Sequence, residues 1–280
     1  MIEFADVYAS YSPEVPILKG VSFRIEDGEF VAFVGTNGAG KSTTMRLMNG
    51  LIKPDSGQVL IDGVPTTQIR TSQMARKVGF LFQNPDRQIC CATVRDELMF
   101  GFKVLRRTGS DAQARVEAVM EEFGFNADDD PFLLNRGARQ LLALASISVM
   151  ELPVVILDEP TTGLDYRECV KVMEAVKRLH RQGTTVVMVC HDMEVVADYA
   201  ERVIVMHDGR KVDEGPTFEV LRREETLTAA HLIAPQAVDI SMRLGARLPR
   251  PKGTVLARAN TIDELEDAIR ELVAGKGGVL

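Results

Sequence analysis

The stretch GTNGAGKST, residues 35–43, decides the fold of this chain. It follows the apolar run EFVAFV at 29–34 and opens a segment with helical spacing at 41–51. Residues 35–42 match the pattern G-x-x-x-x-G-K-[ST], which binds phosphate when it joins a strand to a helix. The sequence supplies that context on both sides. We therefore expect a phosphate-binding loop (P-loop) here.

The residue types in this loop suit a nucleoside triphosphate. Glycines allow positive φ angles, so that backbone N–H groups can point at phosphate oxygens, and the helix N-terminus adds positive potential. Lys41 is expected to reach the β- and γ-phosphates, Ser42 to bind Mg²⁺, and Thr43 to reach the α-phosphate. The predicted nucleotide-binding residues of the loop are Gly35, Thr36, Asn37, Gly38, Ala39, Gly40, Lys41, Ser42 and Thr43.

A pair of acids follows a second buried strand. The run PVVILDE at 153–159 is continuously apolar until Asp158 and Glu159. Beside a P-loop, Asp158 is expected to hold hydrated Mg²⁺, and Glu159 to polarise the water that attacks the γ-phosphate. Paired acids also occur at the ends of ordinary strands, so a catalytic role for this pair is predicted only because the chain also contains a P-loop.

Buried strands alternate with helices along most of the chain. This order predicts an α/β fold with a mostly parallel sheet and helices on both faces. Two strands are expected in 21–34 around an Asp27–Gly28 turn, and a hairpin in 201–215 through Asp208–Gly209. A helical block at about 84–150 lies between two sheet strands, and its second helix is expected to be capped by Ser110 or Asp111.

The C-terminal part of the chain has a different pattern. After Gly215 the sequence is wholly helical, LPRPKG at 248–253 resembles a linker, and residues 261–275 are expected to form a last amphipathic helix. We therefore divide the chain into domains at 1–215 and 216–280. The apolar stretch 141–157 is interrupted by Glu151 and Pro153, which makes it too short to span a bilayer. Any membrane role must then act through a partner.

The composition excludes some function classes. Hydrophobic residues make up 45% and charged residues 26%, which is ordinary for a globular protein. The net charge of −7 argues against a nucleic-acid partner. The N-terminus has no signal-peptide pattern. The four cysteines are expected to be reduced thiols, and the adjacent pair Cys90–Cys91 is expected to pack without chemistry of its own.

Five linked motifs, in this order, make the chain resemble the ATP-binding subunits of ABC transporters over residues 1–215. After the P-loop (Walker A) comes LFQNPDRQ with Gln83, which resembles the family's Q-loop. LNRGARQLLALA follows where the family's LSGGQ signature lies. VVILDEPTTGLD supplies Walker B and a D-loop with Asp165. VCHDME carries His191 where the family has its switch histidine.

The resemblance implies a fold and a set of roles. The fold would be the P-loop NTPase fold of ABC ATPases: a RecA-like core sheet, an N-terminal antiparallel β subdomain, an inserted helical subdomain and a helical C-terminal extension. Gln83 would contribute to Mg²⁺ and sense the γ-phosphate, and His191 would hold the water and Glu159 in line. Tyr11 lies where an aromatic residue stacks on adenine, and Asp165 lies at the dimer interface. The chain would be an ATPase that uses ATP and Mg²⁺.

A finer resemblance is to the ATPases of energy-coupling factor transporters, which import vitamins and metal ions such as cobalt. FQNPDRQI at 82–89 and HLIAPQAVDISMRLG at 231–245 carry it. It implies that the chain is peripheral at the cytoplasmic face of the cell membrane. Its partners would be a second ATPase, a transmembrane coupling protein and a substrate-binding membrane protein. An ordinary ABC importer or exporter subunit is the alternative, and a non-transport ABC ATPase is a more distant one.

The signature departs from the family pattern. Residues 134–138 read LNRGA, so that Asn135, Arg136 and Ala138 replace Ser, Gly and Gln of LSGGQ, while Gly137 is kept. In this family, two subunits close head to tail and each signature completes the partner's ATP site. Asn135 remains a good N-cap. Arg136 could add charge as an arginine finger does, or could hold the dimer apart. We expect a heterodimer with an ATPase that carries LSGGQ.

Overall fold

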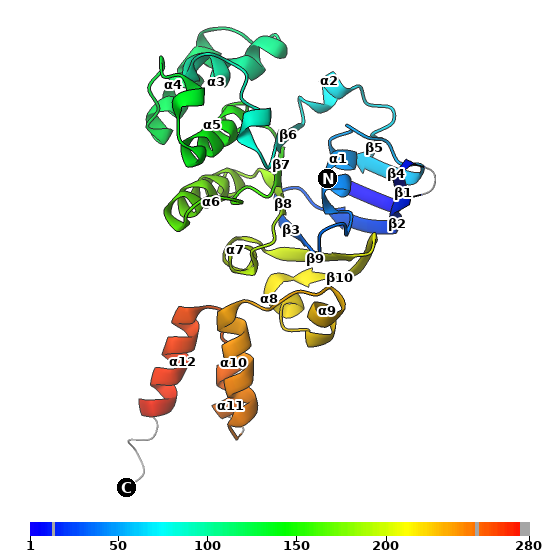
Figure 1. Ribbon diagram of the computed structural model, residues 1–280, viewed down its shortest axis with the longest axis vertical. Coiled ribbons are helices and arrows are strands. Elements are labelled where there is room, and N and C mark those ends of the chain that lie inside the picture. Colours follow the sequence, from blue (N-terminus) through cyan, green and yellow to red (C-terminus); the bar gives the residue numbers. More distant parts are fainter. Residues whose placement is uncertain (13–14, 250–251, 275–280) are drawn as a thin grey trace.

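The computed structural model describes residues 1–12, 15–249 and 252–274, and it confirms the predicted α/β class (Figure 1). Two sheets and a set of helices surround the P-loop. The larger sheet has six strands in the order β10-β9-β3-β8-β7-β6. Its strands are β10 (Arg210–Pro216), β9 (Arg202–His207), β3 (Phe30–Val34), β8 (Thr185–Val189), β7 (Val154–Asp158) and β6 (Val78–Leu81).

The strand before the P-loop lies in the middle of this sheet. All five residues of β3 are buried, and β3 runs parallel to both β8 and β9, with Ala32 opposite Met188 and Val203. A strand that is covered on both faces has no polar alternation, which is why EFVAFV reads as a continuous apolar run. Only β10 is antiparallel, paired with β9 through the predicted Asp208–Gly209 hairpin. The P-loop therefore starts at the carboxyl edge of a rigid parallel sheet.

The smaller sheet is antiparallel, with strand order β2-β1-β4-β5. It consists of β1 (Ile2–Ser12), β2 (Val15–Ile25), β4 (Ser56–Ile61) and β5 (Val64–Pro65). The prediction of two strands in 21–34 around the Asp27–Gly28 turn is confirmed, and β2 and β3 lie in different sheets rather than pairing with each other. The C-terminal half of β2 alternates buried and exposed residues, whereas β3 is buried throughout. The Asp27–Gly28 turn thus carries the chain from one sheet to the other.

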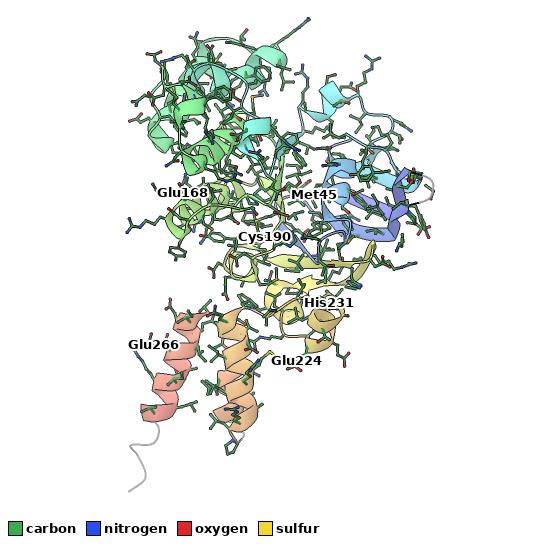
Figure 2. The ribbon with its side chains drawn as sticks, in the orientation of Figure 1. Met45, Glu168, Cys190, Glu224, His231 and Glu266 are labelled. Carbon is green, nitrogen blue, oxygen red and sulfur yellow. The ribbon has the colours of Figure 1, made fainter. Side chains whose placement is uncertain are left out.

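Helix α1 (Lys41–Met48) fills the space between the two sheets (Figure 1). Its side chains Met45, Leu47 and Met48 are fully buried in one apolar cluster with residues from both sheets, and Figure 2 shows Met45 near the centre of the molecule. Gly50, with φ of 70°, ends this helical segment as predicted. The buried face of α1 fixes its N-terminus, and with it the P-loop.

A helical block lies between β6 and β7, as the fold class predicts, and has an apolar cluster of its own. It contains η1 (Pro85–Arg87), α3 (Val94–Val104), α4 (Ser110–Phe123), η2 (Pro131–Leu133) and α5 (Arg136–Ser148). The predicted capping of α4 is wrong: Gly109 is the N-cap, no side chain caps the helix, and Ser110 is already helical.

Helices α6 (Tyr166–Arg181) and α7 (Met193–Tyr199) cover the face of the large sheet opposite α1. A short helix, α2 (Thr71–Met74), precedes β6.

Five helices follow β10. Of these, α8 (Thr217–Val220) and α9 (Glu224–Ala229) pack against the large sheet and contribute to its apolar core. The others, α10 (Gln236–Arg247), α11 (Lys252–Leu256) and α12 (Ile262–Ala274), project away from the sheets (Figure 1). The last predicted helix is confirmed as α12; its predicted end at residue 275 lies outside the described residues. The linker at 248–253 is wrong in its last two residues, which begin α11, and residues 250–251 lie outside the described ranges. No helix within the described residues has the length and apolar character needed to cross a bilayer.

Candidate nucleotide-binding and catalytic site

The P-loop joins β3 to α1 in a backbone conformation that requires glycine at two positions. Gly35 has φ of 145°, and a Cβ added there would lie 2.0 Å from the carbonyl oxygen of Met206. Gly40, the N-cap of α1, has φ of 97°, and its Cβ would lie 2.5 Å from Cδ2 of Leu18. Any side chain would therefore displace the loop. The bare backbone leaves the N–H groups at the start of α1 available to an anion.

The side chain of Lys41 folds back onto the P-loop. Its ammonium is buried and donates hydrogen bonds to the carbonyl oxygens of Gly35, at 2.7 Å, and Thr36, at 2.8 Å. Burial lowers the pKa of Lys41, while the carboxylates of Glu159 and Asp158 act in the opposite direction. A desolvated cation at a helix N-terminus attracts a multiply charged phosphate strongly.

Asp158 lies at the carboxyl end of β7, beside the first turn of α1. The hydroxyl of Ser42 donates a hydrogen bond of 3.3 Å to its Oδ1. Burial raises the pKa of Asp158, and the hydrogen bond from Ser42 opposes that rise. A hydroxyl and a carboxylate oxygen side by side form a hard oxygen donor set of the kind that Mg²⁺ prefers, with its other positions left for water and phosphate. The residues present thus fit the predicted metal.

Glu159 is held by three side chains from three different loops. Nε2 of His191 lies 2.8 Å from its Oε1, Nε2 of Gln83 donates to its Oε2 at 2.6 Å, and the hydroxyl of Thr162 donates to the same oxygen at 3.0 Å. Glu159 itself has φ of 51°, a left-handed conformation that costs a non-glycine residue about 1–3 kcal/mol and occurs mainly at functional sites. The structure therefore brings the predicted catalytic residues Glu159, Gln83 and His191 together.

Thr162 was not among the predicted site residues. It follows Glu159 by three positions in a turn in which its backbone N–H donates to the carbonyl of Glu159 at 3.3 Å. A hydroxyl residue three positions after an acid, in a segment with turn-forming glycine, is the signal that could have identified it.

Tyr11 lies at the rim of the same pocket, with 59% of its surface exposed. Its hydroxyl accepts hydrogen bonds from Arg46, at 2.8 Å, and from Thr43, at 3.4 Å, so that α1 holds the phenol beside the P-loop. Arg46, like Thr162, was not among the predicted site residues. The pocket has a volume of about 340 Å³, and its lining includes Tyr11, Asn37, Gly38, Gly40, Lys41, Ser42, Thr43, Glu159 and His191.

The signature segment 135–138 does not line this pocket. Asn135 is the N-cap of α5, as predicted, and its side chain accepts a hydrogen bond of 2.8 Å from the backbone N–H of Ala138. Gly137 packs against Glu168 of α6, where a Cβ would lie 2.2 Å from the carboxyl carbon. Figure 2 shows Glu168 on the side of the core that faces the helical block. Within one chain, the signature and the P-loop thus belong to separate surfaces.

The side chain of Arg136 lies against the D-loop of its own chain. Its Nη2 donates a hydrogen bond of 3.0 Å to the carbonyl of Thr162, and a Cβ added to Gly163 would lie 2.9 Å from its Nε. Asp165, the predicted D-loop residue, caps α6, and it exchanges hydrogen bonds with Glu168 in a capping box. Thr162 therefore touches Arg136 through its carbonyl and Glu159 through its hydroxyl.

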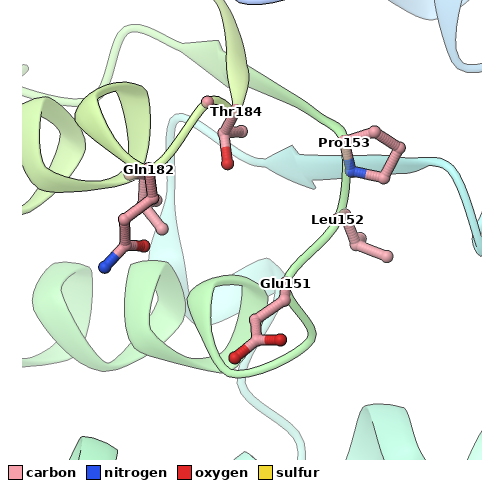
Figure 3. A pocket seen from close by; sticks show the side chains of 7 residues that line it. Glu151, Leu152, Pro153, Gln182 and Thr184 are labelled. Carbon is pink, nitrogen blue, oxygen red and sulfur yellow. The ribbon is translucent and has the colours of Figure 1, made fainter.

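A further pocket, of about 460 Å³, lies at the other end of the large sheet (Figure 3). Pro153 and Thr184 line it just before β7 and β8 begin, whereas the P-loop and Glu159 follow the carboxyl ends of their strands. Its one charged side chain, Glu151, is paired with Arg115 at 2.6 Å. A pocket without a cation or a glycine-rich helix N-terminus does not suit a triphosphate, so the chemistry belongs at the P-loop.

Comparisons with known proteins agree with this geometry. The family described as "ABC transporter" matches residues 18–162. A putative ABC transporter ATP-binding protein of Caldanaerobacter subterraneus subsp. tengcongensis is 41% identical over 88% of this chain, which spans only 43% of that relative. The Energy-coupling factor transporter ATP-binding protein EcfA2 of Symbiobacterium thermophilum is 37% identical, with 99% of this chain and 98% of the relative covered.

Among solved structures, cbiO1 from Clostridium perfringens, described as part of the ABC transporter complex cbiONQ, superimposes with a TM-score of 0.74. It is 31% identical, and the match covers 91% of this chain and 98% of that one. The chain therefore belongs to the ABC transporter family and is an ATP-binding cassette of that family, a class of ATPase.

Proposed function

We propose that this chain binds Mg·ATP at residues 35–43 and hydrolyses it to power a membrane importer of the energy-coupling factor type, with a vitamin or a metal ion as cargo. The observation that carries the proposal is the meeting of Lys41 and Glu159 in one pocket, with Gln83, Thr162 and His191 holding the carboxylate. The whole-length relatives named for energy-coupling factor transport support the subgroup.

The nucleotide is held by the loop and α1. Backbone N–H groups of residues 35–43 and the Lys41 ammonium contact the phosphates, while Thr43 and the Tyr11 ring border the α-phosphate and the base. Ser42, Asp158 and Gln83 would hold Mg²⁺, which supplies charge neutralisation of the β- and γ-phosphate oxygens when bound. Gln83 would then leave Glu159, while Thr162 and His191 still hold it.

Glu159 acts as the general base. It orients a water molecule in line with the bond between the γ-phosphorus and the leaving ADP oxygen, and it accepts a proton as the water oxygen bonds to phosphorus. His191 fixes one carboxylate oxygen and Thr162 the other, so that the accepting lone pair faces the water. Lys41 and the N–H groups of α1 stabilise the charge that develops on the phosphate oxygens.

The hydroxyl of Thr162 gives a direct test of this positioning. Thr162→Val keeps the shape of an exposed side chain but removes one hydrogen bond to Glu159. The loss is about 0.5–1.5 kcal/mol, below the usual range for a charged acceptor, because this bond is exposed to solvent. We expect kcat for ATP hydrolysis to fall about three- to tenfold, with KM for ATP unchanged. Steady-state phosphate release measures both. Thr161→Val is the matched control, and a Thr162→Val enzyme with full kcat would rule out the positioning role.

We further propose that the chain pairs with a second ATPase that carries LSGGQ, and that residues 1–215 form the ATP-binding domain and 216–280 the extension. In a head-to-tail dimer, Asn135, Arg136, Gly137 and Ala138 would face the partner's triphosphate, and Asp165 would lie at the interface. Arg136 has a side chain where glycine permits close approach, and its own D-loop already takes one of its donors. A homodimer, in which such a signature completes each of the two ATP sites, would have both sites weakened.

Repair of the signature tests this pairing. We expect the Glu159→Gln chain to remain monomeric with Mg·ATP, and the same chain with Asn135→Ser, Arg136→Gly and Ala138→Gln to dimerise at concentrations about tenfold lower or less, a gain of about 1.4 kcal/mol or more. Analytical ultracentrifugation with and without Mg·ATP measures this. A chain with its natural signature that closes as tightly as the repaired one would argue for a homodimer. The natural and the repaired signature, each in a chain that keeps Glu159 and is mixed with an LSGGQ-bearing ATPase, show which combination restores turnover.

A further inference from the structure

A group of metal-binding side chains lies outside the nucleotide site, at the junction between the Q-loop and the helical block. Cys90 and Cys91 lie between η1 and α3, so they join the end of the Q-loop to the first α-helix of the block. Glu97 lies on the first turns of α3. The two thiol sulfurs and a carboxylate oxygen of Glu97 all lie within 4.8 Å of one another. Nothing in the ATPase mechanism uses them.

Glu97 is the unusual member of this group. It is only 3% exposed, and its Oε2 accepts hydrogen bonds of 2.9 Å from the backbone N–H groups of both Cys90 and Cys91. A buried carboxylate is normally paired with a cation or coordinates a metal. The two N–H groups fix its position but supply no positive charge.

Among the described residues, the cations of α3 pair with other acids rather than with Glu97. Lys103, six residues after Glu97 in α3, donates a hydrogen bond of 2.7 Å to Asp96 on the exposed side of the helix. Burial, with the nearby Glu97 carboxylate as the second cause, raises the pKa of Cys91 to about 12. Cys90 is exposed, which leaves the group open to solvent on one side.

We propose that Cys90, Cys91 and Glu97 form a binding site for one thiophilic divalent cation of the zinc class. Two sulfurs and one carboxylate oxygen with a solvent-facing fourth position are a three-ligand tetrahedral set of the kind that Zn²⁺ accepts. Sulfur ligands select against Mg²⁺ and Ca²⁺, which prefer oxygen. At Zn–S distances of about 2.3 Å, tetrahedral sulfurs lie about 3.8 Å apart, so that only a small side-chain adjustment is needed.

A cation bound here would restrict the motion of the segment between the Q-loop and α3. It would fasten residues 90–91 to α3, directly after the Q-loop that carries Gln83. The segment that links the γ-phosphate sensor to the helical block would then lose freedom. This inference stands on its own residues and holds whether or not the transport proposal is correct.

Zinc titration of the full-length, reduced and nucleotide-free protein tests the site. We expect calorimetry to give one tight Zn²⁺ per chain, with protons released as the thiols bind the metal. Mass spectrometry of alkylated peptides should show that Zn²⁺ slows modification of Cys90 and Cys91 about tenfold or more, and that excess Mg²⁺ does not. Co²⁺ as a second probe should give thiolate-to-metal absorption bands.

Three variants separate this site from adventitious binding. Cys90→Ser, at an exposed position that leaves the buried packing intact, and Glu97→Gln should each weaken Zn²⁺ binding about tenfold or more, because each removes one of three ligands. Cys169→Ser is the matched control and should bind as the parent does. Unchanged affinity in Cys90→Ser, or alkylation of Cys90 that ignores Zn²⁺, would overturn the proposal, even if Glu97→Gln failed to fold.

Discussion

Glu159→Gln is expected to bind Mg·ATP with the affinity of the parent chain but to turn it over at least about 100-fold more slowly, a loss of about 2.7 kcal/mol of transition-state stabilisation. The amide has nearly the shape of the carboxylate, and His191, Gln83 and Thr162 still surround it. What it lacks is the lone pair and negative charge that accept the water's proton.

Phosphate release and equilibrium nucleotide binding, measured on the same preparation, separate the two steps. Glu219→Gln, on the exposed surface of α8, is the matched control and should hydrolyse ATP as the parent does. Measurements belong in the assembly that turns over, with the LSGGQ-bearing partner where that partner is required. Turnover of Glu159→Gln at the parent's rate would refute the role given to this residue.

Lys41→Ala is expected to weaken nucleotide binding itself, by about 100-fold or more. Hydrogen bonds to charged groups contribute about 1.5–3 kcal/mol each, and we expect this ammonium to make two of them with the β- and γ-phosphates. The loop backbone should keep its conformation, because Gly35 and Gly40 are constrained by Met206 and Leu18 rather than by Lys41 alone.

Fluorescence titration with a nucleotide analogue measures this affinity in the presence of Mg²⁺. Lys177→Ala, which removes a half-exposed ammonium from α6, is the control for the loss of one positive charge and should bind as the parent does. A Lys41→Ala chain with parental affinity would show that the triphosphate is held elsewhere. Circular dichroism and thermal unfolding confirm that each variant is folded before binding is compared.

Much of the fold could be predicted because its strongest signals are local. EFVAFV, PVVILDE and TTVVMVCHD are apolar throughout, as strands buried on both faces must be, and the amphipathic helices between them end at glycines. The pairing of strands is a non-local property, however. The Asp27–Gly28 turn is typical of a hairpin, yet β3 pairs with β8 and β9, since only the parallel sheet buries both faces of β3.

The candidate site divides in the same way. Motif spacing was enough to place Lys41, Asp158, Glu159, Gln83 and His191, and the structure brings these residues to one pocket or into contact with it. Thr162 and Arg46 were missed because their roles depend on which side chain each hydroxyl or guanidinium reaches. The contact of Arg136 with its own D-loop likewise depends on tertiary structure. The roles of these residues in turnover stay predictions.

A crystal structure of Glu159→Gln with Mg·ATP shows directly whether the P-loop holds the nucleotide. We expect density for the triphosphate against the backbone N–H groups of residues 35–43, with Lys41 on the β- and γ-phosphates and the metal beside Ser42 and Asp158. Nucleotide bound at any other surface, or no nucleotide bound to the folded chain at saturating concentration, would contradict this expectation.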